Sequence, residues 1–199
     1  MISEEETHRR AINDVEEWVS TLGDTNENIF TQPMPTQQQV RWKPPASDWV
    51  KCNYDVSHRE GNQNSGLGWI IKNSNGIFLE AGMGKFEGRE TVEEAECTTL
   101  LWATQSAWAL GYPKVEFEGD NLIINRVINN NIMNLKLQHH ITAITNWKAN
   151  FLYIKFTYRK RTANECADLL AKTSIISSSP WIRTTTWADN RAQTKVAIS

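Results

Sequence analysis

The chain has few of the features that mark secreted, zinc-binding or membrane-spanning proteins. Only three of its 199 residues are cysteine, and Cys52, Cys97 and Cys166 are far apart. An odd number of cysteines without CxxC or Cys/His spacing argues against a disulfide framework and against a zinc site. No apolar run approaches the ~18 residues that a membrane span needs. The start, MISEEETHRR, is acidic and lacks the apolar core of a secretory signal. We therefore expect an intracellular protein in a reducing compartment, with no contact to a membrane.

A strong charge of one sign is also lacking, because the formal net charge is only −2. Residues 1–40 carry eight acidic residues against two arginines, which gives −6, and residues 41–199 carry 19 Lys/Arg against 15 Asp/Glu, which gives +4. A mildly basic body behind an acidic leader can tolerate a polyanion, but this charge alone does not predict one. Function has to be inferred from the arrangement of particular residues.

The sequence divides into four segments of different character. Apolar residues recur at three- and four-residue steps in residues 1–22, which predicts a short helix. Residues 23–48 are rich in Gln, Pro, Asn and Thr and are typical of a linker. Residues 49–175 carry regular periodicity and are expected to form the folded domain. Residues 176–199 have no clear period, so we expect a loose tail.

Within the domain, the periodicity alternates between the spacing of strands and that of helices. Asn75 and Gly76, within the stretch NSNG, carry the signature of a tight hairpin between the second and third strands. We expect strands over 48–55, 65–72, 76–86, 114–120 and 151–159, and helices over 89–111, 121–130, 135–150 and 164–174. Three strands in a meander, followed by helices alternating with two more strands, predict an α/β domain with a mixed sheet.

One carboxylate stands on the predicted buried side of the helix 89–111. We expect this helix to begin at the N-cap Thr91, with Glu94 as capping-box partner, and to stop at Gly111. Glu96 lies in the middle of the arc formed by Val92, Leu100, Ala103, Ala107 and Leu110. A helix glutamate can pack its stem and extend its head into water. On this arc, however, the head is buried, and an unpaired buried carboxylate costs several kcal/mol. A cation is the simplest compensation.

Three aspartates occupy related places in the predicted elements. Asp55 and Asp120 close the first and fourth strands, and Asp168 lies near the start of the last helix. Each has an ordinary interpretation: a turn or an N-cap at the strand ends, and a favourable helix dipole for Asp168. If the first and fourth strands are neighbours, all three can meet Glu96. Such a cluster needs divalent cations, and Mg²⁺ prefers oxygen ligands.

These residues, in this order, resemble the ribonuclease H family, type 1, and most closely its plant version in retroelement reverse-transcriptase-like reading frames. The stretches that carry the resemblance run from Trp49 to about Lys172 and are WVKCNYD, GLGWIIKNSNG, EEAECTTLLWA, VEFEGDN and RTANECADLLAK. The resemblance implies a ribonuclease H-like fold, with a five-stranded mixed sheet of a three-strand antiparallel meander plus two parallel strands, flanked by helices. It also implies hydrolysis of the RNA strand of an RNA–DNA hybrid.

The resemblance further assigns roles to the four acidic residues. Asp55, Glu96, Asp120 and Asp168 would be the catalytic residues and would hold two Mg²⁺ ions, with Mn²⁺ as a possible substitute. Asp55 would bridge both ions, Glu96 would hold the ion on the leaving-group side, and Asp168 would complete the side that activates water. The products would carry a 5′-phosphate and a 3′-hydroxyl.

The sequence departs from the family pattern near two of these acids. Val56 and Ser57 follow the first aspartate, where the family usually has Gly and then Ser or Ala. Glu93 and Glu94 stand just before Glu96, where well-studied bacterial relatives carry an Asn that reads the hybrid's minor groove. A second function therefore stays open: a catalytically weak or inactive nucleic-acid-binding or interaction module of retroelement origin.

Positive charge gathers before the last helix, in a group that we call the basic loop: Lys155, Arg159, Lys160 and Arg161. These residues can simply be the solvated end of a strand. Beside a metal site they would instead bind the phosphates of a nucleic acid, which dominate affinity for such partners.

Overall fold

The computed structural model describes residues 41–58, 64–86 and 91–185. The helix predicted for residues 1–22 lies outside the described residues, as does most of the predicted linker. The strands are β1 (Val50–Ser57), β2 (Ser65–Asn73), β3 (Phe78–Phe86), β4 (Lys114–Gly119), β5 (Tyr153–Tyr158) and β6 (Trp181–Thr185). The helices are α2 (Val92–Ala109), α3 (Leu122–Asn130), α4 (Gln138–Lys148), the 3₁₀ turn η1 (Arg161–Ala163) and α5 (Glu165–Ile176).

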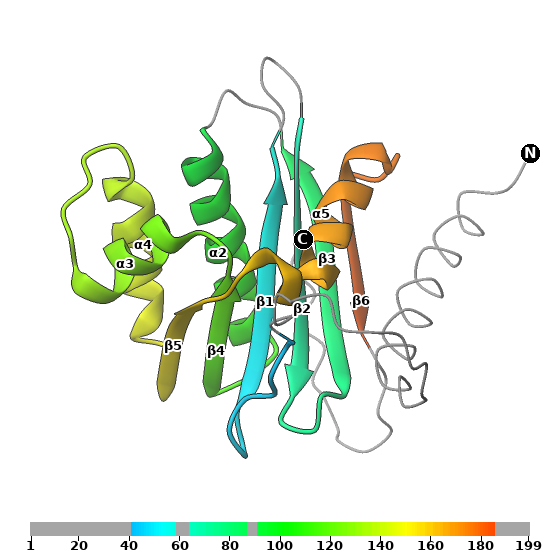
Figure 1. The fold of residues 1–199 in the computed structure, drawn as a ribbon, viewed down its shortest axis with the longest axis horizontal. Coiled ribbons are helices and arrows are strands. Elements are labelled where there is room, and N and C mark those ends of the chain that lie inside the picture. Colours follow the sequence, from blue (N-terminus) through cyan, green and yellow to red (C-terminus); the bar gives the residue numbers. More distant parts are fainter. Residues whose placement is uncertain (1–40, 59–63, 87–90, 186–199) are drawn as a thin grey trace, which may run out of the picture.

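The strands form one mixed sheet in the order β5-β4-β1-β2-β3-β6 (Figure 1). β1, β2 and β3 pair antiparallel as the predicted meander, and β4 and β5 continue the sheet parallel to β1. Because β1 and β4 are parallel neighbours, their carboxyl ends meet at one edge of the sheet. The predicted mixed α/β sheet is confirmed.

The expected count of five strands is wrong, because β6 adds a sixth. This strand pairs antiparallel with β3 and lies within the segment 176–199 that the sequence predicted as loose. β6 is only five residues long and has little periodicity of its own. Its pairing is supplied by the free edge of β3, and the Trp181 ring covers Gly84, where an added Cβ would lie 2.6 Å from that ring.

Two apolar layers cover the two faces of the sheet. Alternate residues of β2 point to opposite sides, so Trp69 and Ile71 belong to one cluster and Ile70 to the other. The larger cluster lies under α2, α3 and α4, and the smaller one lies under α5 (Figure 1). Close approach of α5 requires glycine in β2: a Cβ on Gly68 would lie 2.6 Å from the backbone nitrogen of Ala171.

The local signals at the ends of α2 and in the hairpin are confirmed. The Thr91 side chain accepts from the Glu94 amide, and the Glu94 carboxylate accepts from the Thr91 amide, which completes the capping box. Gly111, just after the helix, and Gly76, in the hairpin, have φ of 78° and 77°. In the described ranges, no helix has both the length and the hydropathy needed to cross a bilayer.

Residues 41–48, predicted as the end of the linker, lie against the sheet. Pro45 is buried, and the Trp42 indole donates to Asn53 Oδ1 at 2.8 Å. The Trp42 ring also lies near the ammonium groups of Lys51 and Lys72, at 5.6 and 5.1 Å. The composition of this segment is that of a linker, but its residues contact β1, β2 and, through the pair of Asp48 with Lys114, β4.

Candidate functional site

Three of the four predicted acidic residues converge at the edge where β1 and β4 end, and we call them the acid cluster: Asp55, Glu96 and Asp120. Asp55 lies near the end of β1, and Asp120 directly follows β4. Glu96 lies in the second turn of α2, on the face packed against the sheet. One carboxylate oxygen from each residue lies within 4.8 Å of the others. The carboxylate on the buried face of the helix thus lies opposite two others.

Burial and mutual repulsion raise the pKa of every member of the acid cluster. The pKa of Asp55 is raised from 3.8 to about 7, by burial first and then by the charges of Asp120 and Asp168, against the Val56 amide and Arg161. The pKa of Glu96 lies well above its ordinary value, because of burial first and then Asp55 and Asp120. Burial also raises the pKa of Asp120, and the Arg161 guanidinium opposes that rise. The three carboxylates are held where their charges are poorly compensated.

Two oxygens of the cluster have a particular need for a ligand. Asp55 Oδ1 accepts from the Val56 amide at 2.8 Å, whereas Asp55 Oδ2 and Glu96 Oε2 are buried with no hydrogen-bond partner among the described residues. Buried carboxylate oxygens without donors are costly. Hard divalent cations such as Mg²⁺ take oxygen ligands of this kind, so the donor set fits such an ion.

Asp168, the fourth predicted acid, is not part of this close group. It lies in the first turn of α5, and its Oδ2 accepts from Lys172 Nζ at 2.5 Å. Its charge nevertheless raises the pKa of both Asp55 and Asp120, so it faces the cluster at longer range. The structure thus brings three of the four acids together and places the fourth beside them.

The basic loop does not form one continuous surface. Arg161 forms an ion pair with Asp120 at 3.3 Å and so touches the acid cluster, while Arg159 pairs with the buried Glu118 at 3.1 Å. Lys155 lies 4.4 Å over the Trp49 ring, and Lys160 is exposed. Of the four, Arg161 is the one that contacts the acid cluster, so the predicted group does not act as a single surface.

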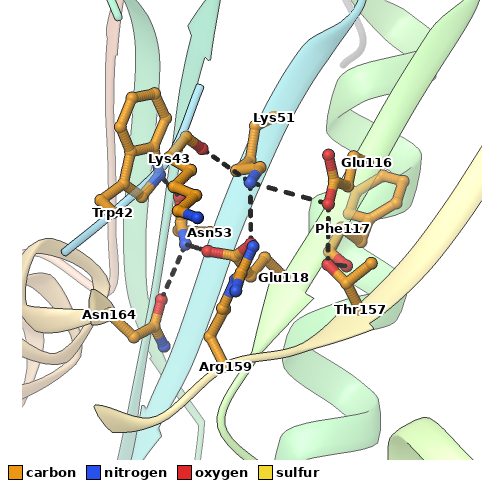
Figure 2. Close-up of polar contacts among 10 residues, drawn as sticks. All are labelled: Trp42, Lys43, Lys51, Asn53, Glu116, Phe117, Glu118, Thr157, Arg159 and Asn164. Carbon is orange, nitrogen blue, oxygen red and sulfur yellow. Dashed lines mark hydrogen bonds and ion pairs between the residues drawn. The ribbon is translucent and has the colours of Figure 1, made fainter. Parts of the chain in front are cut away.

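Sequence reasoning missed a buried polar network below the acid cluster. It lies on the α5 side of the sheet and consists of Lys51, Asn53, Glu118, Arg159 and Asn164 (Figure 2). The signal was present, because Lys51, Asn53 and Asp55 make one side of β1 wholly polar. A polar side on a strand at the centre of a sheet has to find partners within the protein.

Known proteins with similar sequences show the family to which this chain belongs. A sequence profile of the family described as "Reverse transcriptase-like" matches residues 53–174, more than half of the chain. A ribonuclease HI of Halobacterium salinarum is 22% identical over 79% of this chain and 83% of its own length. A protein of Arabidopsis thaliana, provisionally named a ribonuclease H protein, is 25% identical over 82% of this chain, and the match spans 27% of that longer protein.

Solved structures support the same fold. The crystal structure of the Halobacterium salinarum ribonuclease H has a TM-score of 0.59 at 24% identity, covering 63% of this chain and 96% of that one. The ribonuclease named LC11, crystallised in complex with an RNA/DNA hybrid, has a TM-score of 0.58 at 21% identity, covering 63% of this chain and 96% of its own. The sheet and helices described above are therefore a ribonuclease H-like fold.

Proposed function

The chain belongs to the reverse transcriptase-like family, and from that membership we propose that it hydrolyses the RNA strand of RNA–DNA hybrids at the acid cluster. The observation that carries the proposal is the pair of buried carboxylate oxygens, on Asp55 and Glu96, that lack donors in the described chain. The named ribonuclease H relatives support the same class of reaction.

Asp55, Glu96 and Asp120 would hold two Mg²⁺ ions, with Mn²⁺ as an alternative, and Asp168 would complete the site. When bound, such a pair of ions supplies an activated water and stabilises the leaving 3′ oxygen of a phosphodiester. Asp55 would hold the ions together with the other acids, because its charge is coupled to Asp120, to Asp168 and to Glu96. Burial of these carboxylates strengthens their hold on a cation, because few waters compete for them. The products would be a 5′-phosphate and a 3′-hydroxyl.

The nucleic-acid partner would be held on the side where the basic loop meets the cluster. Arg161 touches Asp120, and Lys160, its neighbour in the chain, is exposed. The guanidinium of Arg161 would donate to a phosphate oxygen of the bound strand. The solved complex of LC11 ribonuclease H with an RNA/DNA hybrid supports a hybrid as the partner.

The family description and the Arabidopsis thaliana relative support an origin in a plant retroelement. We assign the activity to the domain predicted for residues 49–175, together with residues 41–48 and β6, which contact its sheet. Cys52 and Cys97 are buried in the core, which supports a reducing intracellular compartment.

A second function is favoured by one contact. Arg161 already places a cation of the chain on Asp120, and Val56 and Glu93 depart from the family pattern nearby. A site that is partly neutralised by its own arginine suits a module that binds nucleic acid but hydrolyses it slowly. This weak or inactive module is the alternative to the enzyme.

The deciding experiment compares hydrolysis by the wild type, Asp55→Asn and Asp48→Asn. Labelled RNA–DNA hybrid, duplex DNA and single-stranded RNA are incubated with each protein in Mg²⁺. We expect cleavage of the hybrid's RNA only, and a loss of more than about 100-fold in Asp55→Asn, since losing a ligand exceeds the 10–100-fold effect of losing an outer-shell partner. Asp48 is exposed and outside the cluster, so Asp48→Asn should keep full activity. Binding of hybrid without cleavage would favour the alternative. A protein that neither binds nor cleaves the hybrid would refute both functions.

A further inference from the structure

Three residues of the buried network are related to the three aspartates by a simple spacing. Asn53 stands two residues before Asp55 on β1, and Glu118 stands two residues before Asp120 on β4. Asn164 stands four residues, about one helical turn, before Asp168 at the start of α5. Residues two apart on a strand share a face, as Asn53 and Asp55 do on β1. Asp120 directly follows β4, and the Asp168 amide donates to the Asn164 carbonyl at 3.2 Å, one helical turn away. Each network residue therefore closely precedes an aspartate on the same element or at its end.

The network connects the three elements by side-chain hydrogen bonds. The Asn53 amide donates to Glu118 Oε1 at 3.1 Å and to Asn164 Oδ1 at 3.2 Å. The Asn164 amide donates to the carbonyl of Tyr54, next to Asp55, at 2.8 Å. All of these side chains are at least 97% buried, and Figure 2 shows Asn53 between Glu118 and Asn164. One asparagine thus joins β1 to both β4 and α5.

Backbone pairing alone does not fix the aspartates relative to one another. β1 and β4 pair from Val50↔Val115 to Asn53↔Glu118, so Asp55 and Asp120 lie two residues beyond that ladder. The side-chain hydrogen bond from Asn53 to Glu118 joins the two strands at Asn53↔Glu118, the last pair of the ladder. α5 is outside the sheet, and Asn164, at its N-cap position, directs its side chain to β1. Asparagine at that position ordinarily caps its own helix, so this side chain serves a tertiary contact instead.

The charges of the network hold Glu118 in place. Glu118 Oε2 accepts from Lys51 Nζ at 2.8 Å and from Arg159 Nε at 3.1 Å, and Lys51 Nζ also donates to the carbonyl of Lys43 at 2.8 Å. A buried ion pair is weak support for stability, because apolar residues of similar size often serve as well or better. Here the pair joins β1, through Lys51, to β4, through Glu118, and to Arg159 just after β5.

We propose that Asn53, Glu118 and Asn164 are positioning residues, which fix the ends of β1 and β4 and the start of α5 so that Asp55, Asp120 and Asp168 face one point. This inference rests on the proposed function only in taking that point as the site of a divalent cation. The acids themselves would bind the ion, and the network below would set their separation.

The test measures Mg²⁺ affinity by calorimetry, on proteins shown by circular dichroism to be fully folded at the measuring temperature. Asn164→Ala removes the bonds to Tyr54 and Asn53. Ser174→Ala is the matched control, because Ser174 is equally buried in the same helix and its hydroxyl bonds only within that helix, to the carbonyl of Ala171. We expect about tenfold weaker Mg²⁺ binding in Asn164→Ala, at the low end of outer-residue effects on metal sites, and no change in Ser174→Ala.

A second variant separates positioning from stability. In Lys51→Met/Glu118→Leu, apolar side chains replace the buried ion pair, so the melting temperature should stay near that of the wild type. Asn53 nevertheless loses its bond to β4, and we expect Mg²⁺ affinity to fall as in Asn164→Ala. In hybrid hydrolysis, kcat should fall in both variants with little change in KM.

The outcomes separate this inference from the proposed function. Unchanged Mg²⁺ affinity in both variants would overturn the positioning role and leave the proposed function intact. If the variants bind Mg²⁺ more weakly than the wild type, but the wild type cleaves no hybrid, the positioning role is supported and the enzyme is refuted. If the wild type binds no Mg²⁺, the proposed function fails, and crystal structures of Asn164→Ala and Ser174→Ala test the positioning role. A start of α5 that is displaced in Asn164→Ala but not in Ser174→Ala supports that role. A helix that is unmoved in Asn164→Ala overturns it.

Discussion

The acid cluster and the buried network lie two residues apart on the same two strands, yet their polar groups are satisfied very differently. In the network, the buried Glu118 meets Lys51, Arg159 and Asn53. In the cluster, the buried oxygens Asp55 Oδ2 and Glu96 Oε2 lack donors among the described residues. Depth of burial is similar in the two regions. The two regions therefore differ in hydrogen-bond and ion-pair partners: Glu118 has three donors, whereas one oxygen each of Asp55 and Glu96 has none among the described residues.

The comparison also explains why the basic loop divides. Arg159 lies at the level of the network and neutralises Glu118, whereas Arg161, two residues later, lies at the level of the cluster and pairs with Asp120. The same residue type thus pairs with a buried carboxylate of the network in one region and with a member of the acid cluster in the other.

The largest effect is expected from removing a charge of the network. Lys51→Ala leaves Glu118 buried with part of its compensation gone, and breaking a buried pair costs about 3–5 kcal/mol of unfolding free energy. Lys114→Ala is the matched control, because its pair with the exposed Asp48 is worth at most about 1 kcal/mol. Urea unfolding of both variants measures the difference. Equal losses would show that the network is not a balanced buried ion system.

In the cluster, removing a charge should have the opposite sign when metal is absent. The folded pKa of Asp55 is about 7 against an ordinary 3.8, so between those values the folded state keeps a proton that the unfolded state loses. The stability of the wild type in EDTA should therefore fall as pH rises from about 4 to about 7, by up to roughly 4 kcal/mol from this group. Asp55→Asn should lose this group's share of the decline, keep the share that comes from Glu96 and Asp120, and be the more stable protein above pH 7.

The measurement is urea unfolding of the wild type, Asp55→Asn and Asp48→Asn across that pH range. Asp48 is exposed, so Asp48→Asn should retain the decline. An Asp55→Asn variant that follows the wild-type curve would mean that the carboxylates are farther apart, or better hydrated, than the structure places them.

Adding Mg²⁺ should make the cluster resemble the network, by supplying the missing partner. A ligand at 100 times its Kd stabilises the folded state by about 2.7 kcal/mol. We expect the Tm to rise with Mg²⁺ in the wild type and in Lys114→Ala, and to return to its starting value with EDTA. Glu96→Gln should lose most of the rise. A wild-type Tm that is indifferent to Mg²⁺ would contradict a cation site at these residues.

The smallest effect separates the two arginines. In an Asp55→Asn background that prevents cleavage, hybrid affinity is measured over a series of salt concentrations. Arg161→Ala should lower the salt slope by about 1, because one phosphate contact is lost. Arg159→Ala should leave the slope nearly unchanged and instead lower the Tm. If both variants change the slope equally, Arg159 also contacts the nucleic acid and its pair with Glu118 is not permanent.

Local sequence signals predicted most of the elements that carry the site. The capping box at Thr91 and the glycine turns depend on neighbouring residues only, and the structure contains them as expected. Glu96 was recognisable because a helix has one buried face and a carboxylate stood on it. The strand β6 was not recognisable, since its five residues are ordered by the edge of β3. The docking of Trp42 was not recognisable either, because it depends on a tertiary contact, the hydrogen bond to Asn53 on β1.

The sequence by itself determined that Asp55 and Asp120 lie at or near the carboxyl ends of strands and that Glu96 faces the sheet, because strand and helix periodicity depend on the nearest few residues. Only the tertiary structure decided that Asp168 stands beside the other acids, and that Arg159 and Arg161 serve different sites. Which charge meets which depends on elements that are far apart along the chain, such as those of Arg159 and Glu118, which are 41 residues apart. No local pattern records that distance.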